Sequence, residues 1–496
     1  MPLARIERWF LRIGVFLLPL AFWWDTYDQY VLPKLLVARL LVIGLLILLV
    51  ARSMATRTLV LKRTPLDVPL AVFLVSALVS TLVAENQNVA VFGIYSRYDG
   101  LLTILTYAGL FWLSVQAIDG PADARMLQRV LLAGGYVVAA IAILKSASDS
   151  ATAGTLIQAY GTLGQQNVLG AFLVMLCPLA YRELMEARTW SGRILAINAL
   201  ALLGAALVLT LSRSAWLGAV VAVIVLLLGN RRHISRSVLV GAAALLLIVG
   251  AVAAMLGLAG GYQFERSIAG RATSVFELTA WGPRPAIWRD SLHLIASRPL
   301  LGYGPDNFGL VYPRFQAASL GTVQVDKAHS ETLQVAATQG LVGAAAYLLV
   351  LGVFVKAFWQ GRQLPGAVPI FAGWIGYQVT LQLNFSALAA SFPFWVFAAA
   401  AIESWGATRL TSSRFLGTSS WVLAAGGTII AGLAVLGVLS TLPLYLADSH
   451  LLRAVNADYG GRMAVARVEA VEAQRLAPAE SVYAEIMKTA KVGVGR

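Results

Sequence analysis

Residues 35–51 read LLVARLLVIGLLILLVA, a run in which Arg39 is the single charged side chain. A helix of about 17–25 apolar residues spans a lipid bilayer, and comparable runs recur along the 496-residue chain. Hydrophobic residues make up 59% of the sequence and charged residues 12%, whereas soluble proteins carry about 25% charged residues. This composition excludes a soluble enzyme and a disordered protein. It predicts an all-α polytopic membrane protein.

Thirteen segments are apolar and long enough to be transmembrane helices, and a count of twelve fits the pattern as well. They lie at residues 10–24, 35–51, 66–84, 101–118, 130–144, 167–181, 194–211, 215–229, 237–258, 332–355, 366–383, 391–405 and 420–446. Two stretches then lie outside the bilayer, a loop at 259–331 between the ninth and tenth helices and a tail at 447–496. The loop is rich in glycine, proline and aromatic residues, which is typical of an ordered loop. We therefore divide the chain into a transmembrane domain at 1–446 and the tail.

The positive charges predict how these helices are oriented. The chain carries 38 Lys and Arg against 24 Asp and Glu, a net charge of +14, which could indicate nucleic-acid binding if the cations clustered on one face. Instead, nineteen of them fall in predicted loops on the side of the N-terminus, and four fall in short loops on the other side. Because cytoplasmic loops are enriched in Lys and Arg, we expect a cytoplasmic N-terminus. The long loop and the tail are then extracytoplasmic, and no nucleic-acid partner is expected.

The tail has alanine and valine at helical spacing from Ala464 to Val471, followed by Ala477, Pro478 and Tyr483. This pattern resembles one helix-turn-helix unit of a tetratricopeptide array, although a single unit cannot bury its apolar face alone. We expect a helical tail that is a remnant or a shortened form of such an array. A scaffold protein that docks a partner through this tail is one alternative function.

Two arginines lie where predicted helices meet the extracytoplasmic side. Arg213 sits in Ser212-Arg213-Ser214, a short polar break between two apolar runs. Arg284 precedes Pro285, which favours the first turn of a helix. An ionisable group at membrane level is costly, and an arginine beside the free amides of a helix start is a good phosphate ligand. Taken alone, Arg213 fits an interfacial arginine equally well, and Arg284 fits the cap of a surface helix. The apolar face of that helix is predicted to carry Ile287, Trp288, Leu292 and Ile295.

His329 lies immediately before the tenth predicted helix. The positive end of a helix dipole should lower the pKa of this imidazole and keep it neutral, as a general base requires. A histidine that simply hydrogen-bonds at a helix start is the alternative for His329 alone. Together with Arg213 and Arg284 it suits transfer of a glycan from a lipid diphosphate to a hydroxyl. The guanidinium groups would neutralise the leaving group, and the imidazole would take the acceptor proton.

Several motifs resemble the Wzy_C family of O-antigen ligases, related polymerases and protein O-oligosaccharyltransferases. They are the stretches 284–288, 298–308, 328–333 and 161–167. The resemblance implies a GT-C-like membrane fold in the bacterial cytoplasmic membrane. It also implies an undecaprenyl-diphosphate-linked glycan donor and metal-independent, inverting transfer. Ser330 stands where the family often has asparagine, and we assign it no role.

The resemblance also implies roles for individual residues. It makes Arg213, Arg284 and His329 catalytic. The residues expected to bind substrate are Arg97, Asn167, Arg289 and Tyr303. Arg97, in the outer-loop segment 93–100, fits an interfacial arginine among tyrosines equally well. No metal and no cofactor are expected, and the acceptor hydroxyl could belong to lipid A–core, a protein, a glycan or a cell-wall polymer.

Two further functions compete with this interpretation. A metal-dependent glycosyltransferase could use Asp25 and Asp28 in the first outer loop, but no second carboxylate cluster completes a hard-metal site. We therefore interpret these aspartates as part of a solvated loop. A flippase for lipid-linked glycans would place charges deep in its helices and repeat its halves. The sequence has no internal repeat and only Arg39 and Glu403 near its spans.

Overall fold

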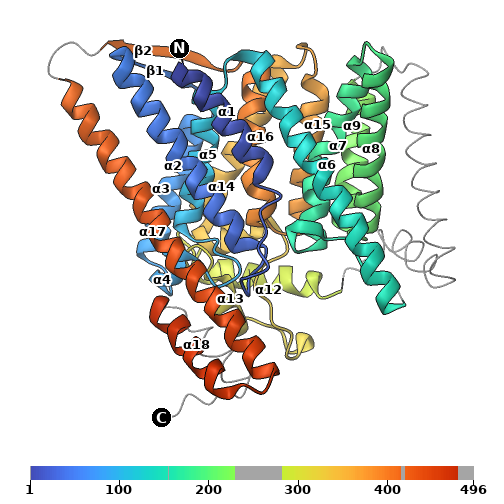
Figure 1. Ribbon diagram of the computed structural model, residues 1–496, viewed down its shortest axis with the longest axis vertical. Helices are drawn as coiled ribbons and strands as arrows, with labels where there is room; N and C mark the ends of the chain where they lie inside the picture. The colour runs from blue at the N-terminus through green and yellow to red at the C-terminus, as the bar shows by residue number, and fades with distance from the viewer. Residues whose placement is uncertain (1, 155, 230–281, 415–418, 479–496) are drawn as a thin grey trace.

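The computed structural model describes residues 2–154, 156–229, 282–414 and 419–478. Long helices lie side by side in one bundle (Figure 1). They are α1 (Pro2–Leu17), α2 (Val31–Thr56), α3 (Asp67–Leu82), α5 (Leu101–Ala117), α6 (Gly120–Ala153), α7 (Gln166–Glu186), α8 (Trp190–Leu209), α9 (Arg213–Gly229), α14 (Glu331–Gly361), α15 (Ala367–Gln382), α16 (Leu388–Ser404) and α17 (Ser419–Tyr459). The shorter helices are α4 (Gln87–Phe92), η1 (Gly161–Leu163), α12 (Arg284–Ser297), α13 (Phe308–Val311), η4 (Tyr312–Arg314), η5 (Ala318–Leu320) and α18 (Met463–Leu476). Of these, α4, α12, α13 and α18 lie at the end of the bundle opposite the N-terminus (Figure 1).

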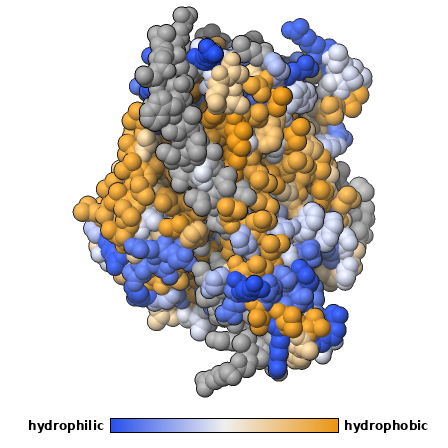
Figure 2. All heavy atoms as spheres, turned by 60° about the vertical axis from the view of Figure 1, so that its left-hand side comes forward, coloured by the Kyte–Doolittle hydropathy of each residue, from blue (hydrophilic) through white to orange (hydrophobic). Residues whose placement is uncertain are grey.

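The helices have the length and composition of membrane spans. Five of the described helices, α2, α6, α7, α8 and α14, are at least 18 residues long and apolar enough to cross a membrane. Hydrophobic side chains form a broad band across the middle of the face shown in Figure 2, and hydrophilic ones gather towards its ends. The predicted all-α polytopic membrane fold is therefore confirmed. Twelve of the thirteen predicted segments overlap a described helix, and the ninth, 237–258, lies outside the described residues.

Some helix boundaries differ from the expected ones. Helix α1 ends at Leu17 instead of residue 24, because Pro19 has no amide hydrogen to continue the helix. Helix α6 runs from Gly120 to Ala153 and so extends beyond the apolar stretch 130–144 at both ends. Apolar length thus locates the membrane-embedded part of a helix but not its polar extensions.

A two-stranded ribbon, which the sequence analysis did not predict, joins distant segments at the N-terminal end of the bundle (Figure 1). Strand β1 (Thr58–Arg63) pairs with β2 (Arg409–Arg414) in antiparallel register, with Thr58 opposite Arg414 and Arg63 opposite Arg409. Both strands lie in segments that were expected to be cytoplasmic loops. Their backbone pairing ties α2 and α3 to α16 and α17.

The tail begins as a helical hairpin. Helix α17 extends to Tyr459, and α18 packs against it through Ala466, Ala470 and Ala473, which are all buried. Small side chains at helical spacing let two helices approach closely, which explains why alanine recurs on this face. The described part of the tail is therefore helical, and its relation to a tetratricopeptide unit stays a prediction. Tyr483 lies outside the described residues.

Helix α14 is interrupted inside its length. Gly340 has φ 68° and ψ −173°, values far from those of a helix. The amides of Tyr303 and Gly304 donate to the carbonyls of Ala337 and Thr338, at 3.2 and 2.8 Å. The amide of Leu341 in turn donates to the carbonyl of Pro299 at 2.7 Å. Backbone groups inside a membrane protein must find partners within the protein. The segment 299–304 provides these partners and is thereby held against α14.

The break predicts a strong effect of substitution at Gly340. A Cβ atom at this position would lie 2.1 Å from the carbonyl oxygen of Leu300, and the positive φ strains any L-residue. We expect Gly340→Ala to lower the free energy of unfolding by about 2 kcal/mol or more, measured by thermal unfolding in detergent. Gly352→Ala on the same helix is the matched control, because its Cβ would meet no atom within 4 Å. Equal stability of the two variants would contradict this account of the break.

Candidate functional site

Helix α12 lies across the end of the bundle, roughly perpendicular to the long helices (Figure 1). It buries Ile287, Leu294 and Ile295 against the segment that leads to α14. Of the predicted apolar face, Ile287 and Ile295 are buried, whereas Leu292 is 57% exposed. Contact of this face with the membrane surface stays a prediction. The helix begins at Arg284, as the proline at 285 predicted.

His329 lies in the turn that leads into α14. Its backbone adopts a left-handed φ of 51°, and its carbonyl oxygen accepts a hydrogen bond from Trp288 Nε1 at 3.3 Å. The imidazole packs against the ring of Phe385, with the ring centroids 5.3 Å apart. Among the described residues, its Nδ1 atom is buried and has no hydrogen-bond partner. The side chain is thus held by the α12 start and by the loop between α15 and α16.

The environment of His329 favours the neutral imidazole. Burial and the positive charge of Arg284 lower its pKa to about 4, against smaller opposing effects of Asp326 and Asn384. The direction is the one expected from the sequence. Desolvation by burial is the largest cause, and the neighbouring guanidinium of Arg284 adds to it.

Arg284 and Arg213 lie close to each other. Burial lowers the pKa of Arg284, and the positive charge of Arg213 lowers it further. Arg213 is the first residue of α9 and lies two positions after Leu211, which has a left-handed φ of 51°. The structure therefore places two half-buried guanidinium groups and the imidazole in one cluster, although 116 positions separate Arg213 from His329 in the sequence. Two neighbouring cations repel each other, so this arrangement favours binding of a polyanion.

Asn167 supports the turn that carries Arg213. The hydroxyl of Ser212 donates to Asn167 Oδ1 at 2.7 Å and lies 3.1 Å from the hydroxyl of Ser214. Asn167 lies in the first turn of α7, which Gln165 caps by accepting from the amide of Val168. The expected substrate contact of Asn167 remains a prediction, since the structure shows its side chain bonded to this turn.

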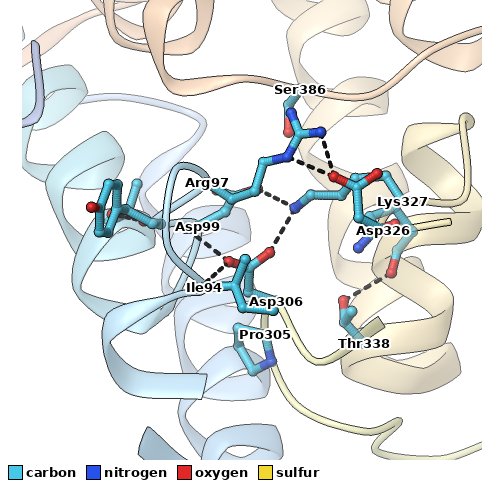
Figure 3. A network of polar contacts seen from close by, with 12 residues as sticks. Ile94, Arg97, Asp99, Pro305, Asp306, Asp326, Lys327, Thr338 and Ser386 are labelled. Carbon is cyan, nitrogen blue, oxygen red and sulfur yellow. Dashed lines mark hydrogen bonds and ion pairs between the residues drawn. The ribbon is translucent and has the colours of Figure 1, made fainter. Parts of the chain in front are cut away.

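Arg97 lies beside Asp326 and Lys327, in the segment that precedes His329 (Figure 3). Its Nε atom donates to Asp326 Oδ2 at 2.7 Å, and its guanidinium group lies over Phe385, 4.9 Å from the ring centroid. Phe385 thus contacts both Arg97 and His329. The flanking residues Ser96 and Tyr98 have positive φ angles of 64° and 49°, which is the kind of local strain found at functional sites.

Lys327 is a component of the site that the sequence analysis missed. It is 2% exposed, and its ammonium group lies 2.9 Å from Asp306 Oδ1 and 3.1 Å from Asp99 Oδ2 (Figure 3). Asp306 Oδ2 also accepts from the amides of Ile94 and Asp99, at 2.7 and 3.2 Å. Burial lowers the pKa of Lys327, but the two carboxylates raise it more, so it stays charged. This ion cluster ties the Arg97 loop and residue 306 to the segment that carries His329.

Two of the expected substrate-binding residues, Tyr303 and Arg289, differ in their exposure to solvent. Tyr303 is buried, with its hydroxyl 2.7 Å from that of Ser297 and its ring under Arg298. Arg289 is exposed on α12 and forms an ion pair with the adjacent Asp290 at 3.3 Å. Tyr303 is therefore packed inside the protein, whereas Arg289 is exposed to solvent. Substrate binding by either residue stays a prediction.

The first outer loop is not the solvated loop that we expected. Asp25 is exposed, but Asp28 is 8% exposed and accepts hydrogen bonds from the amides of Tyr30 and Val31 at 3.2 and 2.9 Å. The Asp28 backbone amide donates to Asp448 of α17 at 2.7 Å. That interpretation was therefore wrong for Asp28, because its carboxylate caps the start of α2. In the described part of the chain, no three His, Cys, Asp or Glu side chains form a group that could hold a metal ion.

Residues 198–348 match the family model described as O-antigen ligase, Wzy_C. The matched stretch contains Arg213, Arg284, Lys327 and His329 and ends within α14. The resemblance predicted from the motifs is thereby confirmed for this part of the chain. No curated protein matches the chain. Members of this family are enzymes of the glycosyltransferase or ligase type, and the match thus supports glycan transfer.

The ion cluster predicts that Lys327 stabilises the site. Lys327→Met would leave the carboxylates of Asp99 and Asp306 buried without their counter-ion, which costs about 3–5 kcal/mol. We expect a correspondingly lower unfolding temperature in detergent. Lys356→Met removes an exposed lysine from α14 and should change stability by less than about 0.5 kcal/mol. If both variants unfold at the wild-type temperature, the cluster does not stabilise this region.

Proposed function

We propose that the protein transfers a glycan from an undecaprenyl-diphosphate-linked donor to an acceptor hydroxyl on the extracytoplasmic side of the membrane. The observation that carries this proposal is the clustering of a neutral, half-buried His329 with Arg284 and Arg213. A neutral imidazole accepts a proton, and paired guanidinium groups bind a diphosphate. The family match over residues 198–348 supports the same class of reaction.

The three side chains suit the two halves of such a transfer. Arg213 and Arg284 would bind the diphosphate and neutralise the charge that develops as the bond between phosphate oxygen and anomeric carbon breaks. His329 would take the proton of the acceptor hydroxyl while the acceptor oxygen forms its bond to the anomeric carbon. Attack from the face opposite the diphosphate inverts this carbon. The charge compensation in this scheme comes from protein side chains, so we propose metal-independent transfer.

The arrangement also makes the pKa of His329 depend on whether the donor is bound. Arg284 is one of the groups that lower the pKa of His329 in the free protein. A bound diphosphate would compensate the charge of Arg284 and raise the pKa of His329 towards its ordinary value of 6.5. His329 then becomes a stronger base only when the donor is present. This coupling would limit proton transfer in the absence of substrate.

Reconstitution with an undecaprenyl-diphosphate-linked glycan and candidate acceptors tests the proposal, with product detected as a mass shift of the acceptor. The panel of acceptors is lipid A–core, a protein, a second glycan and a cell-wall polymer, which distinguishes ligase, protein transferase and polymerase. We expect His329→Ala and Arg284→Ala to reduce transfer at least about 100-fold, the usual scale for a general base or an electrostatic catalyst. Addition of EDTA should leave turnover unchanged.

His293→Ala is the matched control, because His293 is exposed on the same helix as Arg284. Its transfer rate should equal that of the wild type. Near-normal transfer by His329→Ala would show that this histidine is not the base. Movement of the donor across the membrane without any transfer would instead favour a flippase.

The coupling predicts two different pH profiles. A group with a lowered pKa loses its proton at lower pH, so kcat/KM, which reports the free protein, should rise through an acidic limb near pH 4 and stay constant above it. The acidic limb of the kcat profile, which reports the donor complex, should lie at higher pH. The bound diphosphate compensates the positive charge of Arg284 and so raises the pKa of His329. Steady-state rates from pH 3.5 to 8 measure both limbs. A kcat limb at or below the kcat/KM limb would contradict the coupling.

A further inference from the structure

A groove opens between α6 and α8, lined by residues near the starts of both helices. The start of α6 lies at the end of the bundle that carries the N-terminus (Figure 1). Charge bias predicts that this end is cytoplasmic. The mouth of the groove is lined by Arg125, Arg129, Arg188 and Arg193, together with Glu183 and Glu186. The groove lies far from the cluster around His329, which is at the opposite end of the bundle.

The mouth of the groove carries an excess of positive charge. Glu183 forms ion pairs with Arg125 and Arg129 at 3.1 and 2.8 Å. Glu186 pairs with Arg125 at 2.5 Å and with Arg182, behind the groove lining, at 3.0 Å. Arg188 and Arg193 are exposed and form no ion pair with any described residue. The four arginines that line the mouth thus outnumber its two carboxylates, and the two without an ion pair, Arg188 and Arg193, lie at the start of α8. This surplus is complementary to a phosphate group.

Below the charged mouth the groove is apolar. Its wall is formed by apolar side chains, namely Phe16, Leu132, Ala133, Val137, Leu195 and Ala199. The small side chain of Ala133 is exposed there and leaves room beside α6. Further from the mouth, the hydroxyl of Tyr136 on α6 donates to Asn198 Oδ1 on α8 at 2.6 Å. This hydrogen bond closes the gap between the helices about one and a half turns below Arg193.

We propose that this groove binds one anionic phospholipid of the inner leaflet. Its phosphate group would lie against Arg188 and Arg193, and the glycerol and the first part of an acyl chain would occupy the apolar wall above Tyr136. A basic pocket between membrane helices on the cytoplasmic side is the kind of site that anionic headgroups occupy. The lipid would hold α6 to α8 at the end where charged side chains otherwise repel each other.

Native mass spectrometry of the full chain, purified in detergent and titrated with phosphatidylglycerol, tests this site. We expect one tightly bound lipid. Arg188→Gln combined with Arg193→Gln should weaken its binding about 30-fold, since each arginine near the membrane surface contributes about 1 kcal/mol. Ala133→Phe keeps all charges but fills the groove, and it should weaken binding as well. The matched control is Arg63→Gln with Arg409→Gln, which removes two exposed arginines of the β1–β2 ribbon from the same end and should not change affinity.

Three outcomes would overturn the proposal. Phosphatidylcholine binding as tightly as phosphatidylglycerol would show that the charged mouth does not select the headgroup. Inorganic phosphate displacing the lipid at equal concentration would show an anion site without a lipid component. Equal loss of affinity in the ribbon control would show that binding follows net charge and not this groove. Glycan transfer is not part of the measurement, so its result is independent of the proposed function.

Discussion

The break in α14 at Gly340 is the constraint on which the site depends. A helix that stops and restarts inside the bundle leaves amides and carbonyls that must be satisfied within the protein, and segment 299–304 satisfies them with its own backbone. The loop is therefore fixed at the level of the membrane helices, and α12 with Arg284 leads directly into it. Asp306 follows, and it pairs with Lys327 two residues before His329. The hydrogen bonds that satisfy the broken backbone of α14 thus fix the position of the cluster of Arg213, Arg284 and His329.

The sequence predicts part of this fold well, for identifiable physical reasons. Apolar runs of bilayer length report burial in lipid directly, so twelve predicted spans coincide with helices. Arg284 and His329 could be singled out because each stands directly at the start of a predicted helix, inside a motif that resembles a known family. The break at Gly340 falls inside one continuous predicted span, 332–355, because a glycine in an apolar run gives no sign of its φ angle. The β1–β2 ribbon escaped prediction because its two strands are some 350 positions apart and individually look like loops.

The ion pairs of the site are also not predictable from the sequence, because their partners are far apart along the chain. Lys327 bonds to Asp99, which is 228 positions away, and Arg97 bonds to Asp326 across 229 positions. No local spacing encodes such pairs, and they form only after the helices have assembled. Asp28 was also not predictable. Its neighbours in the sequence are those of a polar loop, but in the structure its carboxylate is buried and accepts hydrogen bonds at the start of α2. Candidate reacting groups were thus accessible to sequence analysis, whereas the groups that hold them in place were not.

A structure of the protein with a bound lipid diphosphate would test the central claim most directly. The account predicts that the diphosphate oxygens lie within about 4 Å of the guanidinium groups of both Arg213 and Arg284, the range of an ion pair. The anomeric carbon should then face the imidazole of His329. A diphosphate bound elsewhere in the protein, with both arginines left in contact only with protein groups, would contradict the account.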